Sequence, residues 1–291
     1  MPFALHATRP PGKRSATLLE REVDAAFAAL SAHGAAGPTD QAVHEVRRRG
    51  KRSRALLRLL RGSPGGRGLE AGWRHVGRAS SGFRDAHAIG TTLVGLLRGD
   101  RPLAQAEGRS AREHVAVFCA HQRKELTARL PALTTRLTRL RAHIARWRPE
   151  CSWQDLVARL VDGYRRSRQA ARSACGHRDH EARHAWRRRV KSFAIQMGLL
   201  RPLWPEAMLV WTREWDRLAD TLGAEHDLHL LLAFLRALPT PRGTADLQRV
   251  VEQRLAHLRA DADRLGRRVH AEKPRAFAAR VDAYRRAIKL G

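Results

Sequence analysis

Residues 43–61 read VHEVRRRGKRSRALLRLLR, and this stretch decides both the fold class and the expected function. In an α-helix, residues three and four positions apart share a face. One face is therefore a row of cations, the first basic stripe, made of His44, Arg47, Lys51, Arg54 and Arg58, with Arg48 and Arg52 beside it. Another face is apolar and can be buried: Val43, Val46, Leu57 and Leu60. Since Glu45 is the one acid here, the crowded cations predict a polyanionic ligand.

The same sequence pattern occurs a second time, in residues 183–191, RHAWRRRVK. Five polar residues of the first copy recur in register, each 140 positions later, at His184, Arg187, Arg188, Arg189 and Lys191. We call His184, Arg187, Arg188 and Lys191 the second basic stripe. Trp73 precedes Asp85 by twelve residues, and Trp215 precedes Asp227 by twelve, in each case before a D-x-H triplet. The sequence therefore predicts an internal duplication, with an offset of 140 that grows to 142.

The overall composition is that of a globular but strongly basic chain. It has 291 residues, 43% of them hydrophobic, and 56 Lys plus Arg against 28 Asp plus Glu, a formal net charge of +28. This excess predicts a polyanionic partner: nucleic acid, inorganic polyphosphate or an anionic membrane surface. Three scattered cysteines, no signal-peptide pattern and no apolar run of membrane-spanning length favour a soluble cytoplasmic protein.

Along the whole chain, apolar residues recur at helical spacing in stretches that Gly and Pro residues separate. β-Branched residues are few. The sequence predicts an all-α fold of two pseudo-symmetric antiparallel helical bundles, residues 14–147 and 153–290. In the first half we expect helices at 15–33, from about 41, at 69–97, at 104–130 up to Pro131, and at 134–147. In the second half we expect them at 153–175, 181–200, 208–238, 245–270 and 274–290.

These motifs together resemble the CHAD family, the conserved histidine α-helical domain. Its hallmark helix, H-x-x-R-x-x-x-[KR], matches VHEVRRRGKRSRALLRLL and RHAWRRRVKSFAIQMGLL. LADTLGAEHDLHLLL resembles the LG-x-x-x-D-x-x-x-LL helix of the family, and AEKPRAFAARV resembles its terminal segment. The resemblance runs from about residue 14 to the C-terminus. It implies binding of inorganic polyphosphate in a basic groove or pore between the bundles, and association with polyphosphate granules.

The predicted site contains the cations and histidines of both stripes. Arginine offers a planar fork for phosphate oxygens and lysine a mobile charge, while phosphates push histidines toward the charged form. The predicted polyphosphate-binding residues are His44, Arg47, Arg48, Lys51, Arg54, Arg58, His184, Arg187, Arg188 and Lys191, and a second group is Arg84, Arg123, His226, Arg254 and Lys273. Because Ser192 and Ala194 stand where the first copy has Arg52 and Arg54, we expect the first stripe to be dominant.

Residues 180–184, HEARH, match the H-E-x-x-H pattern of zinc proteases. The corresponding residues 40–44, DQAVH, lack the first histidine and the glutamate, and arginines flank the motif. In zinc proteases the glutamate of this pattern lies in an apolar active-site cleft, and a third ligand follows downstream. We therefore predict no metal, no cofactor and no catalytic residue, and a binding protein rather than an enzyme.

Other polar and aromatic residues have simpler interpretations. We expect Asp85 and Asp227 each to hold a cation or histidine of a basic helix, and Trp73, Trp186, Trp211 and Trp215 to lie in the core. The sequence leaves two roles open for His87, His226 and His229. Each either lines the binding site or is an ordinary histidine of the core or the surface.

Two other functions fit the same residues. Nucleic-acid binding by a nucleoid-associated protein needs only cations on a duplex backbone, although aromatic residues, 5% of the chain, offer few stacking platforms for single strands. A metal-dependent hydrolase using His180 and His184 is the other alternative.

Overall fold

The computed structural model describes residues 3–6, 9–32, 39–98, 105–177, 179–239 and 244–288, with the side chains of 105–107 left aside. Within these ranges the chain is helical and contains no strand, which confirms the all-α prediction. The helices are α1 (Pro11–Ser31), α2 (Asp40–Leu59), α3 (Gly66–Ala79), α4 (Ser81–Leu97), α5 (Gln105–Arg146), α6 (Trp153–Ala174), α7 (His180–Leu199), α8 (Pro205–Arg236), α9 (Ala245–Val269) and α10 (Pro274–Ala287), with a 3-10 turn η1 (Arg201–Leu203). In the part of the chain that is described, no helix is both long and apolar enough to cross a membrane.

Side-chain caps set the starts of the basic helices. The Thr39 hydroxyl accepts a hydrogen bond from the Ala42 amide at the start of α2. Asp179 accepts one from the Glu181 amide at the start of α7. Both basic helices therefore begin one turn before their stripe histidine, His44 or His184.

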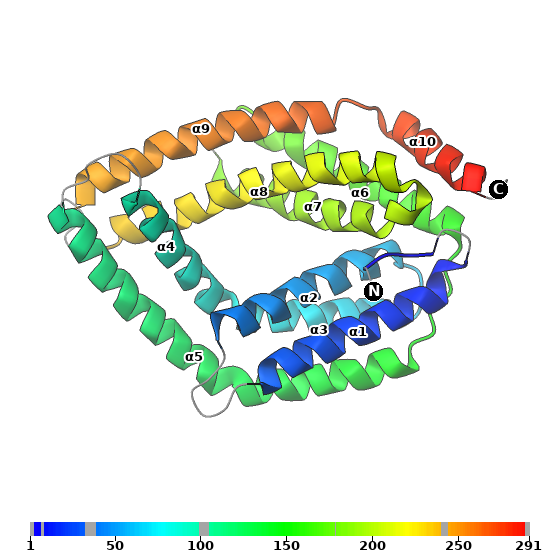
Figure 1. The fold of residues 1–291 in the computed structure, drawn as a ribbon, viewed down its shortest axis with the longest axis horizontal. Helices are drawn as coiled ribbons and strands as arrows, with labels where there is room; N and C mark the ends of the chain where they lie inside the picture. The colour runs from blue at the N-terminus through cyan, green and yellow to red at the C-terminus, as the bar shows by residue number, and fades with distance from the viewer. Residues whose placement is uncertain are drawn as a thin grey trace.

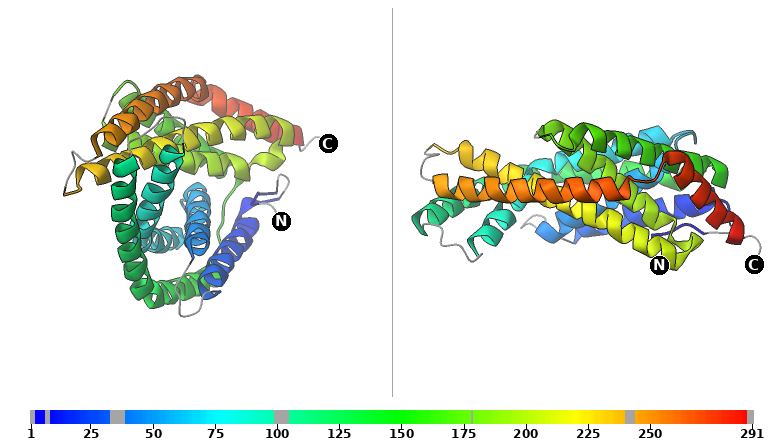
Figure 2. Two further views of the ribbon diagram at one scale, coloured as in Figure 1. Left: turned by 60° about the vertical axis from the view of Figure 1, so that its left-hand side comes forward. Right: turned by 90° about the horizontal axis from the view of Figure 1, so that it is seen from above.

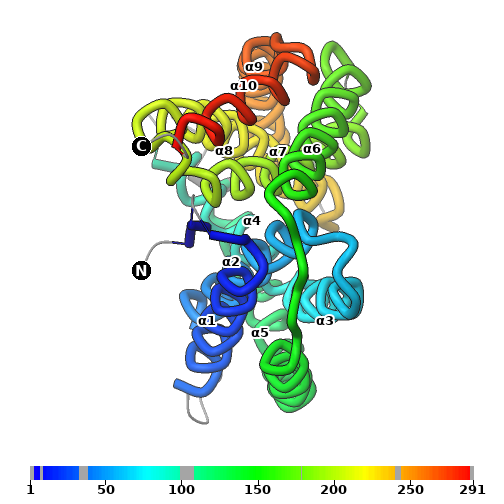
Figure 3. The backbone as a smooth tube through the Cα atoms, turned by 90° about the vertical axis from the view of Figure 1, so that its right-hand side faces the viewer, coloured from blue at the N-terminus to red at the C-terminus, as the bar shows by residue number. Residues whose placement is uncertain are grey.

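The helices form two groups joined by the link between α5 and α6, where the predicted boundary at 148–152 also falls. Figure 3 shows α1, α2, α3 and the end of α5 on one side of this link, and α6, α7, α8, α9 and α10 on the other. In Figure 1, α2 and α7 lie in the middle of the molecule, and α4 with the start of α5 reaches across to α8 and α9. The two basic helices are thus inner elements of the fold.

The apolar residues pack into two clusters, and each contains residues from both halves of the chain. The larger lies around α1, α2, α6 and α7 and includes Trp73, Trp186 and Trp215, all 0% exposed. This confirms the prediction that these tryptophans lie in the core, whereas Trp211 is half-buried. The smaller cluster joins leucines and valines of α4, α5, α8 and α9, such as Leu93, Val115, Leu231 and Val251. These clusters support the helices from behind the cationic faces.

Two predicted helix boundaries are wrong. The helix expected at 69–97 is interrupted at Ser80, which separates α3 from α4. The break expected at Pro131 is absent, because α5 continues through it. Proline removes one backbone hydrogen bond and bends a helix, and Figures 1 and 2 show α5 bending between its two parts. Packing of both parts, through Val115 in one cluster and Leu137 in the other, keeps the helix intact despite the proline.

Gly266 lies where α9 packs closely against the core, and a substitution there tests this packing. A Cβ built there would lie 2.5 and 2.6 Å from two carbons of the buried Trp186 ring. We expect Gly266→Ala to lower the free energy of unfolding by about 1–3 kcal/mol, the usual cost of overpacking a core. Urea unfolding followed by circular dichroism measures it.

Gly95→Ala in α4 is the matched control, since no atom lies within 4 Å of the added Cβ. It should gain about 0.5–1 kcal/mol from the higher helix propensity of alanine. Equal effects of the two substitutions would contradict the close packing of α9 on Trp186.

Candidate functional site: a cationic cavity between two basic helices

The two basic helices lie side by side and bond directly to each other. Arg58 of α2 donates a hydrogen bond of 2.9 Å to the Ser192 hydroxyl of α7. The buried Gln196 amide of α7 donates one of 3.0 Å to the Ala55 carbonyl of α2. Both basic stripes therefore face a shared space.

Buried carboxylates anchor each basic helix on the side away from the other. Glu22 of α1, 3% exposed, accepts a 3.0 Å hydrogen bond from Arg49 of α2. Arg183 of α7, also 3% exposed, pairs with Glu225 of α8 and with Asp263 of α9, the latter at 2.9 Å. These ion pairs offset part of the repulsion that the stripes create.

A cavity of about 690 Å³, the central cavity, lies between α2, α3, α4, α7 and α8. Nine arginines and one lysine line it, and Asp85 is the only carboxylate among its described lining residues. These cations are Arg47, Lys51, Arg54, Arg58, Arg74, Arg78, Arg84, Arg187, Arg188 and Arg189. Such an excess of cations over acids suits an anion with several charges.

Arg47 is held in place by the break between α3 and α4. Its guanidinium donates to the Gly77 carbonyl at 2.7 Å and to the Ser80 hydroxyl at 3.1 Å. The Nε atom of Arg47 is buried and has no hydrogen-bond partner among the described residues. The same is true of Nε in Arg187, its counterpart in the second stripe. Because buried donors are normally satisfied, these two matching Nε groups are exceptions, one in each basic helix.

Burial and mutual repulsion act on the cations of the cavity. Burial, followed by Lys191, Arg47 and Arg187, lowers the pKa of Lys51 to about 7. Burial, followed by Arg84, lowers the pKa of Arg47 and of Arg187 to about 10 each. The pKa of Lys191 is lowered in the same way, first by burial and then by Arg187. A bound anion would reverse these shifts, since it stabilises the charged forms.

Arg84 of α4 lies between two carboxylates and joins the two halves of the chain. It donates to Asp85 at 3.0 Å and to Asp227 of α8 at 2.6 Å. The prediction that each aspartate holds a residue of its own basic helix is therefore wrong, because both hold Arg84. His87, the histidine of the first D-x-H triplet, lies 3.0 Å from Asp40 instead.

The structure brings seven of the ten predicted stripe residues to the central cavity: Arg47, Lys51, Arg54, Arg58, His184, Arg187 and Arg188. His44, Arg48 and Lys191 are not among its lining residues. Arg48 forms a double hydrogen bond with Glu45, at 2.7 and 2.8 Å. Lys191 passes beside Gly223, where a Cβ would lie 3.4 Å from its Nζ. Burial is the main reason that the pKa values of His44 and His184 are lowered.

Of the second group of predicted residues, two line the central cavity and three lie elsewhere. Arg84 and His226 line the central cavity. Arg123 of α5 instead donates to Asp40 at 2.8 Å and lies over the Phe83 ring. Arg254 is exposed on α9, and Lys273 borders a separate shallow pocket with Arg165, Arg168, Arg172 and Arg275.

The sequence-based prediction omitted three lining arginines. Arg74 and Arg78, one turn apart on α3, stand at the exposed edge of the cavity. Their i, i+4 spacing was a usable signal. Arg189 was recognised as part of the repeat but left out of the site. It lines the central cavity together with Arg188.

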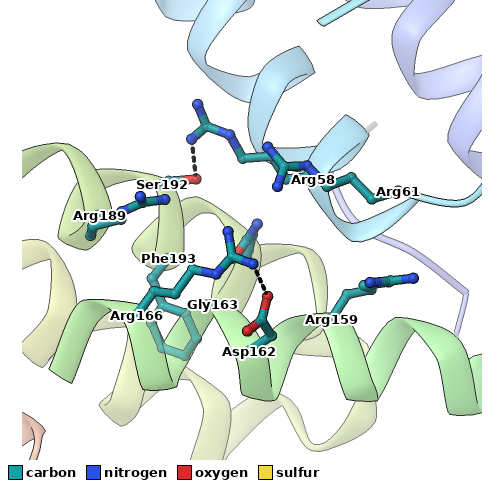
Figure 4. A pocket seen from close by; sticks show the side chains of 10 residues that line it. Arg58, Arg61, Arg159, Asp162, Gly163, Arg166, Arg189, Ser192 and Phe193 are labelled. Atoms are coloured by element: carbon teal, nitrogen blue, oxygen red, sulfur yellow. Dashed lines mark hydrogen bonds and ion pairs between the residues drawn. The ribbon is translucent and has the colours of Figure 1, made fainter. Parts of the chain in front are cut away.

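A smaller pocket of about 70 Å³, the side pocket, shares Arg58 and Arg189 with the central cavity. Figure 4 shows Arg58 bonded to Ser192, and Arg166 of α6 bonded to Asp162 across from it. The remaining charged residues of this pocket are Arg61 and Arg159. The cationic lining therefore continues from the central cavity past the contact between α2 and α7.

Comparison with known proteins identifies the family. The family model of the CHAD domain matches residues 17–236, so the chain belongs to the CHAD family. The crystal structure of the CHAD domain from the plant Ricinus communis is similar, with a TM-score of 0.69 and 15% sequence identity over 93% of this chain and 95% of that chain. At this identity the likeness shows a shared fold. No protein with a curated description matches the sequence.

Because the pKa of Lys51 is lowered in the folded protein, the free energy of unfolding depends on pH in a predictable direction. Between the folded pKa, about 7, and the unfolded value, 10.5, the unfolded chain binds more protons at this residue, so stability rises with pH. From pH 7 to pH 9 the free energy of unfolding of the wild type should gain about 2 kcal/mol relative to Lys51→Met. Urea unfolding of both proteins at each pH measures this difference, and a constant difference would show that Lys51 keeps its ordinary pKa.

Proposed function

We propose that this protein binds inorganic polyphosphate in the central cavity. The observation that carries the proposal is the charge of the central cavity, which has ten cations and a single carboxylate among its described lining residues. A polyphosphate chain presents oxygen acceptors and negative charge along its whole length. It would accept charge-assisted hydrogen bonds from these cations and reduce the repulsion between the stripes.

The lining favours a ligand without bases. Single-stranded nucleic acids are held by aromatic platforms on which bases stack. Trp73 is the only tryptophan, tyrosine or phenylalanine among the described lining residues, and it is 0% exposed. Cations dominate the remainder, so the lining can neutralise phosphates but offers no surface for stacking.

We propose further that the two halves of the chain are copies of one helical bundle and that both contribute to this site. The support is the register of the two stripes and the position of both at the central cavity. The role proposed is binding without catalysis, in association with polyphosphate granules. Asp85, the carboxylate of the cavity, is already paired with Arg84 and is therefore not free to act as a general base.

The first test removes two cations from each stripe. We expect the quadruple variant Arg47→Ala, Lys51→Ala, Arg187→Ala and Lys191→Ala to bind long-chain polyphosphate at least about 100-fold more weakly at moderate salt. The reason is that a hydrogen bond to a charged group contributes about 1.5–3 kcal/mol, and 1.4 kcal/mol is tenfold in affinity. Calorimetric titration measures the change.

The control loses the same charge elsewhere, by changing exposed Arg112, Arg139, Arg146 and Arg217 to Ala. It should bind within a few-fold of the wild type. If both variants lose affinity equally, net charge rather than the cavity binds the polyanion. If duplex DNA displaces polyphosphate at equal phosphate concentration, nucleic acid is the preferred ligand and the proposal is wrong.

The second test compares the stripes. We expect Arg47→Ala, Lys51→Ala and Arg54→Ala together to weaken polyphosphate binding several-fold more than Arg187→Ala, Arg188→Ala and Lys191→Ala together. Four cations of the first stripe line the cavity, whereas Lys191 of the second does not. Titrations of the two triple variants, which lose the same charge, decide the order. The reverse order would make α7 the dominant helix.

A further inference from the structure

Three histidines from two helices converge at one end of the central cavity. His180 and His184 lie on the first turns of α7, and His226 lies on α8. One ring nitrogen from each is within 4.8 Å of the other two. The Nδ1 atoms of His184 and His226 are 3.3 Å apart. Ligands at about 2.0–2.1 Å from a tetrahedral zinc ion are separated by about 3.3 Å, so this pair already has the spacing of two ligands on one ion.

The Nδ1 atoms of His184 and His226 share a hydrogen bond, which a metal ion would replace. Nε2 of His180, by contrast, is buried and has no hydrogen-bond partner among the residues that the structure describes. The His229 ring stacks on His180 with 3.5 Å between centroids and 13° between planes. Imidazole binds a metal ion through an unprotonated ring nitrogen.

The corresponding positions of the first half carry side chains of other types. By the offsets of the repeat, Asp40 stands for His180 and Arg84 for His226. Asp40 pairs with His87 at 3.0 Å, and Arg84 is held by Asp85 and Asp227. A guanidinium thus takes the place of the third ligand. The two halves differ most in polar chemistry at this point, which sets the histidine cluster apart from the shared cationic stripes.

We propose that His180, His184 and His226 form a binding site for one divalent transition-metal ion of the zinc class. Imidazole is a preferred ligand of such ions. His184 and His226 also line the central cavity, so the fourth coordination position would open toward the cavity and accept water or an anionic oxygen. The site needs no particular anion in the cavity and therefore does not depend on polyphosphate binding.

This site is not that of a zinc protease. The third histidine of the cluster is His226, 42 positions after His184. The glutamate of the H-E-x-x-H match, Glu181, has a side chain that is 87% exposed, with an oxygen 4.0 Å from His180 Nδ1. It is not buried in a cleft beside the cluster, where a general base would act on a metal-bound water. The neighbouring arginines would favour an anion as the fourth ligand.

The test is a titration of Zn²⁺ into tag-free, chelator-treated full-length protein, with polyphosphate absent. We expect one ion per chain, and Co²⁺ in its place should give the visible absorption of a tetrahedral site. Loss of an outer partner of a metal ligand alone costs about 10- to 100-fold in affinity, so His226→Ala and His184→Ala should each weaken Zn²⁺ binding at least tenfold. Circular dichroism of each variant checks that it is folded.

The matched controls are His87→Ala, from the first half, and His257→Ala, on the exposed face of α9. Both should bind Zn²⁺ as the wild type does. Absence of stoichiometric Zn²⁺ binding, or equal affinity in the wild type and the folded His226→Ala variant, would overturn the proposal. So would an equal loss in the controls, which would indicate scattered surface binding. Failure of polyphosphate binding in a separate titration would leave this result unaffected.

Discussion

Two cationic helix faces held against the same cavity are the constraint on which the rest of this structure depends. Charges of one sign in a partly desolvated space repel, and the lowered pKa values of Lys51, Arg47 and Arg187 reflect this. The opposing contributions lie behind the stripes, in apolar cores that include both halves and in the buried acids Glu22 and Glu225. The core therefore holds the cations together before any ligand arrives.

This arrangement supports the proposed binding of an anion. Arg47 is oriented by the Gly77 carbonyl, and Arg84 by two aspartates, so little side-chain freedom remains to be lost on binding. An anion would replace repulsion by charge-assisted hydrogen bonds. The same helices that form the core also orient the cations, so stability and the proposed binding depend on one set of contacts.

The two halves place similar helices around the cavity but supply different side chains at one end of it. On the first, Asp40, Arg84 and His87 form ion pairs. On the second, the imidazoles of His180, His184 and His226 come together. A guanidinium excludes a cation, whereas imidazole lone pairs attract one. Positions that correspond in the proposed duplication therefore differ in their affinity for a cation.

The sequence by itself determined the helical class, both basic helices, the core tryptophans and most of the cationic lining, because helical periodicity is a local property that residues three and four apart reveal. It could not determine contacts between helices. Only the tertiary structure decided that α5 continues through Pro131, that Ser80 ends α3 where Arg47 needs an acceptor, and that both aspartates bind Arg84. Likewise His226 meets His184 across 42 positions of chain. Packing between helices sets these contacts, and no spacing within one helix encodes them.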